Sequence, residues 1–147
     1  MTQQVKIGPK FFANELKVYR NWVEAFWREN IQNSFDAKAP RIDITIAAEI
    51  DGTTEVRFVD NGVGMDRNTL ENIYFTLGET TKTGNSVGGF GKARILTCFA
   101  QKKYTLRTHK LYVEGCGADY TIEETETFQN GVDLRVEVFT NGKDLLQ

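Results

Sequence analysis

The sequence predicts an α+β fold: a two-layer α/β sandwich whose mixed, mostly antiparallel sheet carries helices on one face. Three observations support this prediction. Residues from about 14 to 37 have the apolar spacing of an amphipathic helix, residues 41–60 form two alternating runs around a turn, and residues 101–139 contain further alternating runs. Helices clustered among hairpin-like strands favour this sandwich over a parallel βαβ fold.

The first predicted helix has apolar side chains at intervals of three and four residues. These are Leu16, Tyr19, Val23 and Phe26, with Trp22 and Trp27 widening the apolar face. Core packing is the simplest role for these aromatic rings. Pro40 should end the helix, because proline has no N–H to donate and restricts the residue before it.

A hairpin is predicted directly after this helix. The run "RIDITIAAEI" alternates isoleucine with polar residues, and "TTEVRFVD" alternates Val56 and Phe58 with charged neighbours. The two runs meet at Asp51 and Gly52, a dipeptide typical of hairpin turns. The two strands should therefore share one apolar face.

The remaining elements are read from shorter patterns. A short helix fits "DRNTLENIYFTL", the Gly/Thr-rich "GETTKTGNSVGGFG" is predicted to be a loop, and "KARILTCFA" returns to a helical pattern. Beyond Gln101, the runs "KYTLRTHKLYVEG", "ADYTIEE" and "VDLRVEVF" predict strands separated by turn residues such as Asn130 and Gly131.

Composition restricts the classes of function. The chain has 147 residues, which suits one domain spanning 1–147, and 18 Lys and Arg balance 20 Asp and Glu to a formal charge of −2. It has no basic block to follow a nucleic-acid backbone or a membrane surface, and no apolar run long enough to span a bilayer. Cys98 and Cys116 stand apart and His109 is the single histidine, so free thiols in a cytoplasmic protein are expected.

The stretch "ENIQNSFDA" is the first candidate functional motif. Its spacing places Glu29, Asn33 and Asp36 on one face of the predicted helix, where two carboxylates and an amide could converge on a ligand. The ordinary alternative is the solvent-facing side of a surface helix.

The stretch "VDNGVGMD" is the second. Asp60 ends an apolar strand at the rim of the sheet, and Gly62 and Gly64 allow a tight turn or a close approach to a ligand. The ordinary alternative is a strand-ending turn.

The stretch "SVGGFGKARI" is the third. Gly88, Gly89 and Gly91 precede a predicted helix, so backbone N–H groups and the positive helix end could hold phosphate oxygens, with Lys92 adding charge. The motif is not a Walker loop, because neither Ser nor Thr follows its lysine. The alternative is a flexible surface loop.

Taken in order, these three motifs resemble the N, G1 and G2 boxes of the GHKL ATPases. This superfamily includes type II topoisomerases, heat-shock chaperones, histidine kinases, MutL and MORC proteins, and it has the Bergerat fold. The segment "NSFDAKAPRIDITI" is similar to the MutL version, whereas "LGETTKTGNSVGGFGKA" is closer to the short lids of MORC-type and chaperone-type members. The resemblance extends from about Trp22 to Phe139.

The resemblance implies ATP and Mg²⁺ as ligands and assigns a role to each matching residue. Glu29 would be the general base that activates water, Asn33 would coordinate Mg²⁺, and Asp60 would accept a hydrogen bond from the adenine amino group. The other implied ligand-binding residues are Asp36, Ala37, Gly62, Gly64, Met65, Lys82, Gly88, Gly89, Phe90, Gly91, Lys92 and Ala93.

Two departures from the family pattern modify these expectations. Ala93 replaces a glycine of the chaperone and kinase versions, as it does in the MutL branch. Val132 occupies the place of a threonine whose hydroxyl lies near the adenine, so lower affinity or specificity for adenine is expected.

The expected function is Mg²⁺-dependent ATP binding with slow hydrolysis, in which lid closure drives a conformational or dimerisation switch. The resemblance implies a second domain, beyond Gln147, from which relatives supply a Lys or Arg to the γ-phosphate. We therefore expect this chain to need such a domain or a dimer partner for full activity. It is expected to be either a fragment of a longer protein or a stand-alone member. A non-catalytic ATP-sensing module is the alternative. A protein-histidine kinase is less favoured, because His109 lies in a strand-like run.

Overall fold

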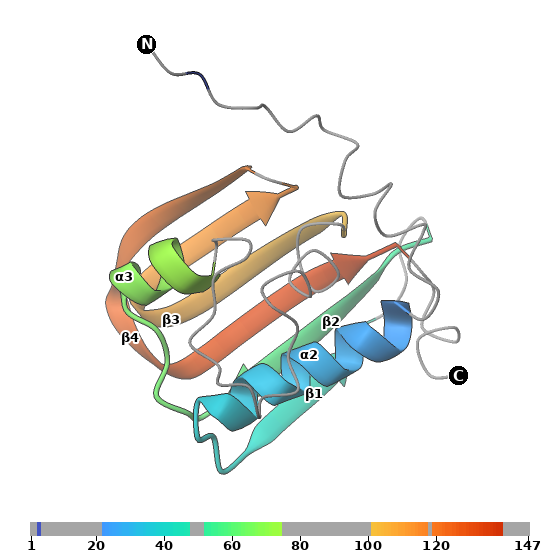
Figure 1. Cartoon of the computed structure of the whole chain (residues 1–147), viewed down its shortest axis with the longest axis horizontal. Helices are drawn as coiled ribbons and strands as arrows, with labels where there is room; N and C mark the ends of the chain where they lie inside the picture. Colours follow the sequence, from blue (N-terminus) through green and yellow to red (C-terminus); the bar gives the residue numbers. More distant parts are fainter. Residues whose placement is uncertain (1–2, 4–21, 48–51, 75–100, 118, 140–147) are drawn as a thin grey trace.

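The computed structural model describes Gln3 and residues 22–47, 52–74, 101–117 and 119–139. Its elements, in chain order, are α2 (Trp22–Asp36), β1 (Ile42–Ile46), β2 (Thr54–Asp60), α3 (Arg67–Thr69), the π-helical turn η1 (Leu70–Tyr74), β3 (Lys103–Cys116) and β4 (Asp119–Val138). The described strands form one sheet in the order β1-β2-β4-β3, with every pairing antiparallel. Figure 1 shows α2 lying across one face of this sheet. The predicted α+β class is therefore confirmed.

Helix α2 ends where the sequence predicted, although proline is not the group that closes it. The N–H of Ala39 donates to the carbonyl of Ser34 and that of Lys38 to the carbonyl of Phe35, while Lys38 has φ of 59°. These are the two bonds of a Schellman motif, which satisfies the last carbonyls of a helix. Pro40 then prevents the chain from continuing as a helix. The predicted residues of this helix before Trp22 lie outside the described part of the chain.

The predicted first hairpin forms, but its buried apolar face is mainly that of β2: Ile44 of β1 is 42% exposed, and Asp51 of the predicted turn lies outside the described residues. Ile42 pairs with Asp60 and Ile46 with Val56, so alternate residues of β2 point toward α2. Val56 and Phe58 are buried there, and the ring of Phe58 makes edge-to-face contacts with Phe26 and Trp27 of α2. Burial of these apolar surfaces holds the helix on the sheet.

The core continues across the other strands. Its buried apolar members are Ala25, Phe26, Val56, Phe58, Leu70, Tyr74, Tyr104, Leu106, Leu111, Val113, Leu134, Val136 and Val138. They come from α2, η1 and from β2, β3 and β4, so a single core joins both layers.

Strand β3 turns back on itself at His109. This residue has φ of 49°, and the register with β4 shifts on both sides of it. Two contacts show that the halves of β3 lie side by side. Lys103 forms a 3.0 Å ion pair with Glu114, and the guanidinium of Arg107 stacks 4.4 Å from the ring centre of Tyr112. The fold thus gains an additional hairpin within one predicted strand.

Strand β4 reverses its direction near the turn predicted at Asn130 and Gly131. The strand extends from Asp119 to Val138, but its residues 119–124 pair with 111–116 and its residues 132–137 pair with 103–108, which are the two oppositely directed halves of β3. Gly131 has φ of 65°, and a Cβ atom placed on it would lie 2.7 Å from Oδ1 of Asp60. Gly131 therefore allows a close approach between β4 and β2 next to the reversal.

The segment after β2 is helical, as predicted, but not uniformly α-helical. Asp66 caps α3 by accepting a 2.8 Å hydrogen bond from the N–H of Thr69, and this backbone donor lowers the pKa of the Asp66 carboxyl. The five residues of η1 then adopt the wider π form. Within the described residues, no helix is long and apolar enough to cross a membrane.

Candidate functional site

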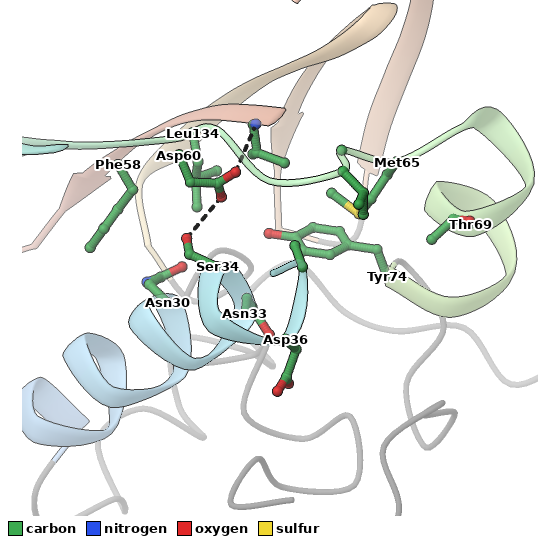
Figure 2. A pocket seen from close by; sticks show the side chains of 14 residues that line it. Asn30, Asn33, Ser34, Asp36, Phe58, Asp60, Met65, Thr69, Tyr74 and Leu134 are labelled. Carbon is green, nitrogen blue, oxygen red and sulfur yellow. Dashed lines mark hydrogen bonds between the residues drawn. The ribbon is translucent and has the colours of Figure 1, made fainter. Parts of the chain in front are cut away.

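A cavity of about 260 Å³ lies between the C-terminal half of α2 and the sheet. It is lined by residues of α2, of β2 and the loop after it, of α3 and η1, and of β4: Asn30, Asn33, Ser34, Asp36, Ala37, Phe58, Asp60, Val63, Gly64, Met65, Thr69, Tyr74, Val132 and Leu134. Figure 2 shows polar groups at one side, where Asp60 and Ser34 meet, and the ring of Tyr74 entering from η1. The cavity combines a few polar groups with mostly apolar walls, as binding sites for organic ligands do.

Asp60 is held rigidly at the floor of the cavity. Its Oδ1 accepts hydrogen bonds from the N–H of Gly62 at 3.0 Å and of Val132 at 3.3 Å. Its Oδ2 accepts a 2.8 Å bond from the Ser34 hydroxyl. A carboxylate has about four acceptor positions, so one position on Oδ2 is left for a donor from the cavity.

The loop after β2 packs so closely that glycine is required twice. A Cβ atom on Gly62 would lie 2.6 Å from the carbonyl oxygen of Ala37. Gly64 has φ of 71°, and its Cβ would lie 2.8 Å from the Thr108 hydroxyl and from the ring of His109. Both glycines let the loop touch the end of α2 and the bend of β3 at once.

Hydrogen bonds fix this loop in place. The N–H of Val63 donates to the carbonyl of Ala37 at 3.0 Å, and the carbonyl of Val63 lies 2.9 Å from Nε2 of His109. The ring of His109 stacks on Phe128 of β4, with ring centres 5.1 Å apart. The cavity wall is therefore tied to both layers of the fold.

Thr108 is buried behind Met65 and hydrogen-bonds to two backbone groups. Its hydroxyl donates to the carbonyl of Gly131 at 2.7 Å and accepts from the N–H of Met65 at 2.9 Å. The backbone of Met65 is thus set by β3 and β4. Nothing in the sequence motif indicated this residue, because it lies 43 positions away from Met65.

The helix contributes two rows of polar side chains. Asn30 and Ser34 face the sheet and are buried, whereas Asn33 and Asp36 line the outer side of the cavity. Asp36 accepts a 2.8 Å hydrogen bond from Gln32, and Figure 2 shows its carboxylate pointing away from Asp60. Glu29 lies one turn before Asn33 and is 5% exposed, but it is not among the lining residues.

The structure therefore brings part of the predicted site together. Six of the predicted residues line one cavity: Asn33, Asp36, Ala37, Asp60, Gly64 and Met65. Gly62 bonds to Asp60 behind the wall, and Glu29 lies beyond the lining. The other predicted ligand-binding residues lie outside the described part of the chain: Lys82, Gly88, Gly89, Phe90, Gly91, Lys92 and Ala93.

Several lining residues were not predicted. They are Asn30, Ser34, Phe58, Val63, Thr69, Tyr74 and Leu134. Asn30 and Ser34 carried a signal that helical spacing could have revealed, since residues four apart share a face and two polar residues on the sheet-facing side are unusual. Tyr74 carried no such signal, because the π-helical turn decides where its ring points.

Val132 was expected to leave the site without a hydroxyl near the adenine. Its side chain does line the cavity, and only its backbone N–H reaches the carboxylate. A hydroxyl is nevertheless present, since Ser34 donates to Asp60 from the opposite layer.

Comparisons with known proteins agree with this fold. A model of the family described as histidine kinase-, DNA gyrase B-, and HSP90-like ATPases matches residues 23–134. Among solved structures, a similar one is described as the crystal structure of the N terminal domain of a DNA repair protein, with a TM-score of 0.59 and 21% identity over 88% of this chain. At that identity the likeness shows the fold alone, and this chain spans 39% of that chain. No curated protein matches.

The two-layer fold and the family match define an ATP-binding domain of the GHKL type. The family match covers most of the chain, and the protein belongs to the histidine kinase-, DNA gyrase B- and HSP90-like ATPases. The resemblance inferred from the three sequence motifs is thereby confirmed.

Proposed function

We propose that this domain binds Mg²⁺–ATP with the adenine seated against Asp60 and hydrolyses it slowly. The observation that carries the proposal is the fixed carboxylate of Asp60, which keeps one acceptor position open toward the cavity. An exocyclic amino group of a purine is a donor of the right kind for that position. Asp60 is thereby the residue that selects the base.

The rest of the lining suits a nucleoside. Phe58, Met65, Val132 and Leu134 give apolar surface for the faces and edges of a planar base. Asn33 and Asp36 on the outer side offer oxygen atoms at the end where sugar and phosphates would emerge. Such hard oxygen ligands, together with phosphate oxygens, are those that Mg²⁺ prefers.

In this proposal Asn33 would hold Mg²⁺ through its amide oxygen, and the ion would supply positive charge to the phosphates. Glu29, one turn earlier on α2, accepts a proton from the attacking water. The water oxygen forms a bond to the γ-phosphorus, the bond from that phosphorus to the β–γ bridging oxygen breaks, and ADP leaves with the electron pair. The glycines of residues 88–91, with Lys82 and Lys92, hold the phosphates in a lid that closes on ATP.

We further propose that residues 1–147 act as one domain that works with another domain or a second copy. A cation supplied from outside is needed for full turnover in comparable phosphoryl-transfer systems and contributes about 10³–10⁵ in rate. Closure of the lid would then drive a conformational or dimerisation switch.

Calorimetric titration with a non-hydrolysable ATP analogue, with and without Mg²⁺, tests the binding proposal. Asp60→Asn keeps the volume of the side chain, and its remaining oxygen can still accept the N–H groups of Gly62 and Val132. Its amide then offers hydrogens to the cavity instead of an acceptor, so binding should fall by at least about tenfold. Equal binding by the folded variant and the wild type would contradict the assignment of Asp60.

The position of Glu29 supports a second candidate, an ATP-sensing module without useful turnover. Glu29 is buried and lies beyond the residues that line the cavity. Single-turnover hydrolysis with excess protein distinguishes the two. If the domain is an ATPase, Glu29→Gln should bind ATP normally and hydrolyse it about 10²–10⁴ times more slowly. If it is a sensor, the wild type should be no faster than the variant.

A further inference from the structure

The deep side of the cavity contains a second acceptor that the family resemblance does not assign. Asn30 lines the cavity and is only 3% exposed. Its Oδ1 is buried and accepts no hydrogen bond within the described part of the chain. A buried amide oxygen without a donor is costly, and it is uncommon in native proteins unless a water or a ligand satisfies it.

The orientation of the Asn30 amide follows from the hydrogen bond that its nitrogen makes. Nδ2 of Asn30 donates a 3.1 Å hydrogen bond to the carbonyl of Phe26, one turn earlier on α2. Exchanging the two ends would place the amide oxygen against that carbonyl oxygen, where both groups are acceptors. Oδ1 must therefore face away from the helix backbone, and Figure 2 shows it on the side of Ser34 and the cavity.

Asn30 and Asp60 together form a pair of acceptors. Ser34 lies four residues after Asn30 on the same face of α2, so their Cβ atoms are about 5–6 Å apart. The hydroxyl proton of Ser34 is already donated to Oδ2 of Asp60. Next to this bond, the open position on Oδ2 and the oxygen of Asn30 both need a donor.

We propose that Asn30 is a base-reading residue, whose Oδ1 accepts one N–H of the exocyclic amino group of a purine, directly or through one bound water. The other N–H goes to Asp60. This inference rests on the proposed nucleotide binding and deepens it. An amino group has two hydrogens and matches two acceptors, whereas the 6-oxo group of guanine or hypoxanthine would place an acceptor against both. Asn30 thus strengthens selection for 6-aminopurines by the same cavity.

The test compares two nucleotides and two variants. Binding of ATP and of purine riboside triphosphate, which lacks the amino group, is measured by calorimetry with Mg²⁺ for the wild type and for Asn30→Leu. Leucine has a similar volume and no acceptor. The matched control is Asn72→Leu, which removes an exposed amide that bonds to Asn68 and does not line the cavity.

The expected result is a loss that depends on the amino group. Asn30→Leu should bind ATP about three- to tenfold more weakly than the wild type and bind the amino-free nucleotide equally well. Asn72→Leu should leave both affinities unchanged. An unchanged ratio between the two nucleotides in Asn30→Leu, with ATP still bound by the wild type, would overturn the role of Asn30 and leave the proposed function intact. If the wild type bound neither nucleotide, the proposed function itself would fail.

A second measurement needs no substitution in the cavity. The side-chain amide signals of Asn30 in ¹⁵N-labelled wild-type protein should move when ATP is added and move much less with the amino-free nucleotide. Equal shifts with both nucleotides would contradict the inference. Greater thermal stability of Asn30→Leu together with unchanged affinities would identify the amide as a structural group that binds only water.

Discussion

The hydroxyl of Ser34 donates a 2.8 Å hydrogen bond to Oδ2 of Asp60 and so joins the helix layer to the sheet layer at the floor of the cavity. The two residues are 26 positions apart in the chain. Because the backbone N–H groups of Gly62 and Val132 hold the other oxygen, the carboxylate is fixed from three segments of the chain. Such preorganisation lowers the entropic cost of binding a base.

Ser34→Ala should weaken both folding and nucleotide binding. The substitution removes a buried donor to a charged acceptor, and bonds of this kind contribute about 1.5–3 kcal/mol. We expect urea denaturation to show a loss of about that size and calorimetry to show weaker binding of ATP. Ser34→Thr keeps the hydroxyl and serves as the control; it should retain most of both quantities. A stable Ser34→Ala protein with wild-type affinity would show that Asp60 needs no support from α2.

Gly64→Ala should destabilise the protein more than Gly52→Ala. Both glycines have positive φ, at 71° and 78°, so alanine is strained at either position by about 1 kcal/mol. At Gly64 the new Cβ would also collide with Thr108 and His109, whereas at Gly52 it would meet nothing within 4 Å. Each variant is compared with the wild type by urea denaturation. The loss of unfolding free energy in Gly64→Ala should exceed that in Gly52→Ala by about 1–3 kcal/mol, and this difference measures how tightly the loop packs. Equal losses would mean that the loop moves aside freely.

Thr108→Val should loosen the loop behind Met65 while keeping the shape of the side chain. The substitution leaves the N–H of Met65 and the carbonyl of Gly131 without the hydroxyl that bonds to both. Leaving buried polar groups unpaired costs about 1–3 kcal/mol each, so a clear drop in the urea midpoint is expected. Thr105→Val, on the opposite face of the same strand, is the control and should change stability by less than about 0.5 kcal/mol. Similar midpoints for the two variants would refute the structural role of Thr108.

Asp133→Asn should change how stability depends on pH. Burial of Asp133 by itself raises its pKa, but hydrogen bonds and attraction from Arg57, with a further contribution from Arg135, outweigh burial and lower the pKa below its usual value. The carboxylate of Asp133 accepts two bonds from Arg57, at 3.1 and 2.9 Å. Since the folded pKa is below the unfolded value of about 4, this carboxylate stabilises the fold above about pH 4 and loses that contribution as pH falls through the folded pKa.

Urea denaturation between pH 7 and pH 2.5 measures this effect. The wild type should exceed Asp133→Asn by about 1–2 kcal/mol near neutral pH, a reduced figure because Arg57 is partly exposed, and the difference should vanish in acid. Asp43→Asn breaks an ion pair of two exposed side chains and is expected to change stability by less than about 0.5 kcal/mol at neutral pH. A constant difference between wild type and Asp133→Asn at every pH would contradict the role of the ion pair.

The sequence predicted the elements near the cavity because their signals are local. Apolar spacing located α2, alternation located β1 and β2, and the order of the motifs indicated the family. The turn predicted at Asn130 and Gly131 lies where β4 reverses between its two paired segments, and Gly131 also makes room for the nearby Asp60. The reversal at His109 was missed, because no Gly or Pro marks it.

The sequence by itself determined the fold class, the family and the candidate residues Asn33 and Asp60, since periodicity and motif order are properties of neighbouring positions along the chain. Tertiary structure alone decided which side chains meet Asp60 and which polar atoms are buried without a donor. Ser34, Val132 and the oxygen of Asn30 acquire their roles only when α2 packs on β2 and β4. The physical reason is that hydrogen bonding and burial depend on distance in space, and antiparallel pairing brings together residues that are far apart in sequence.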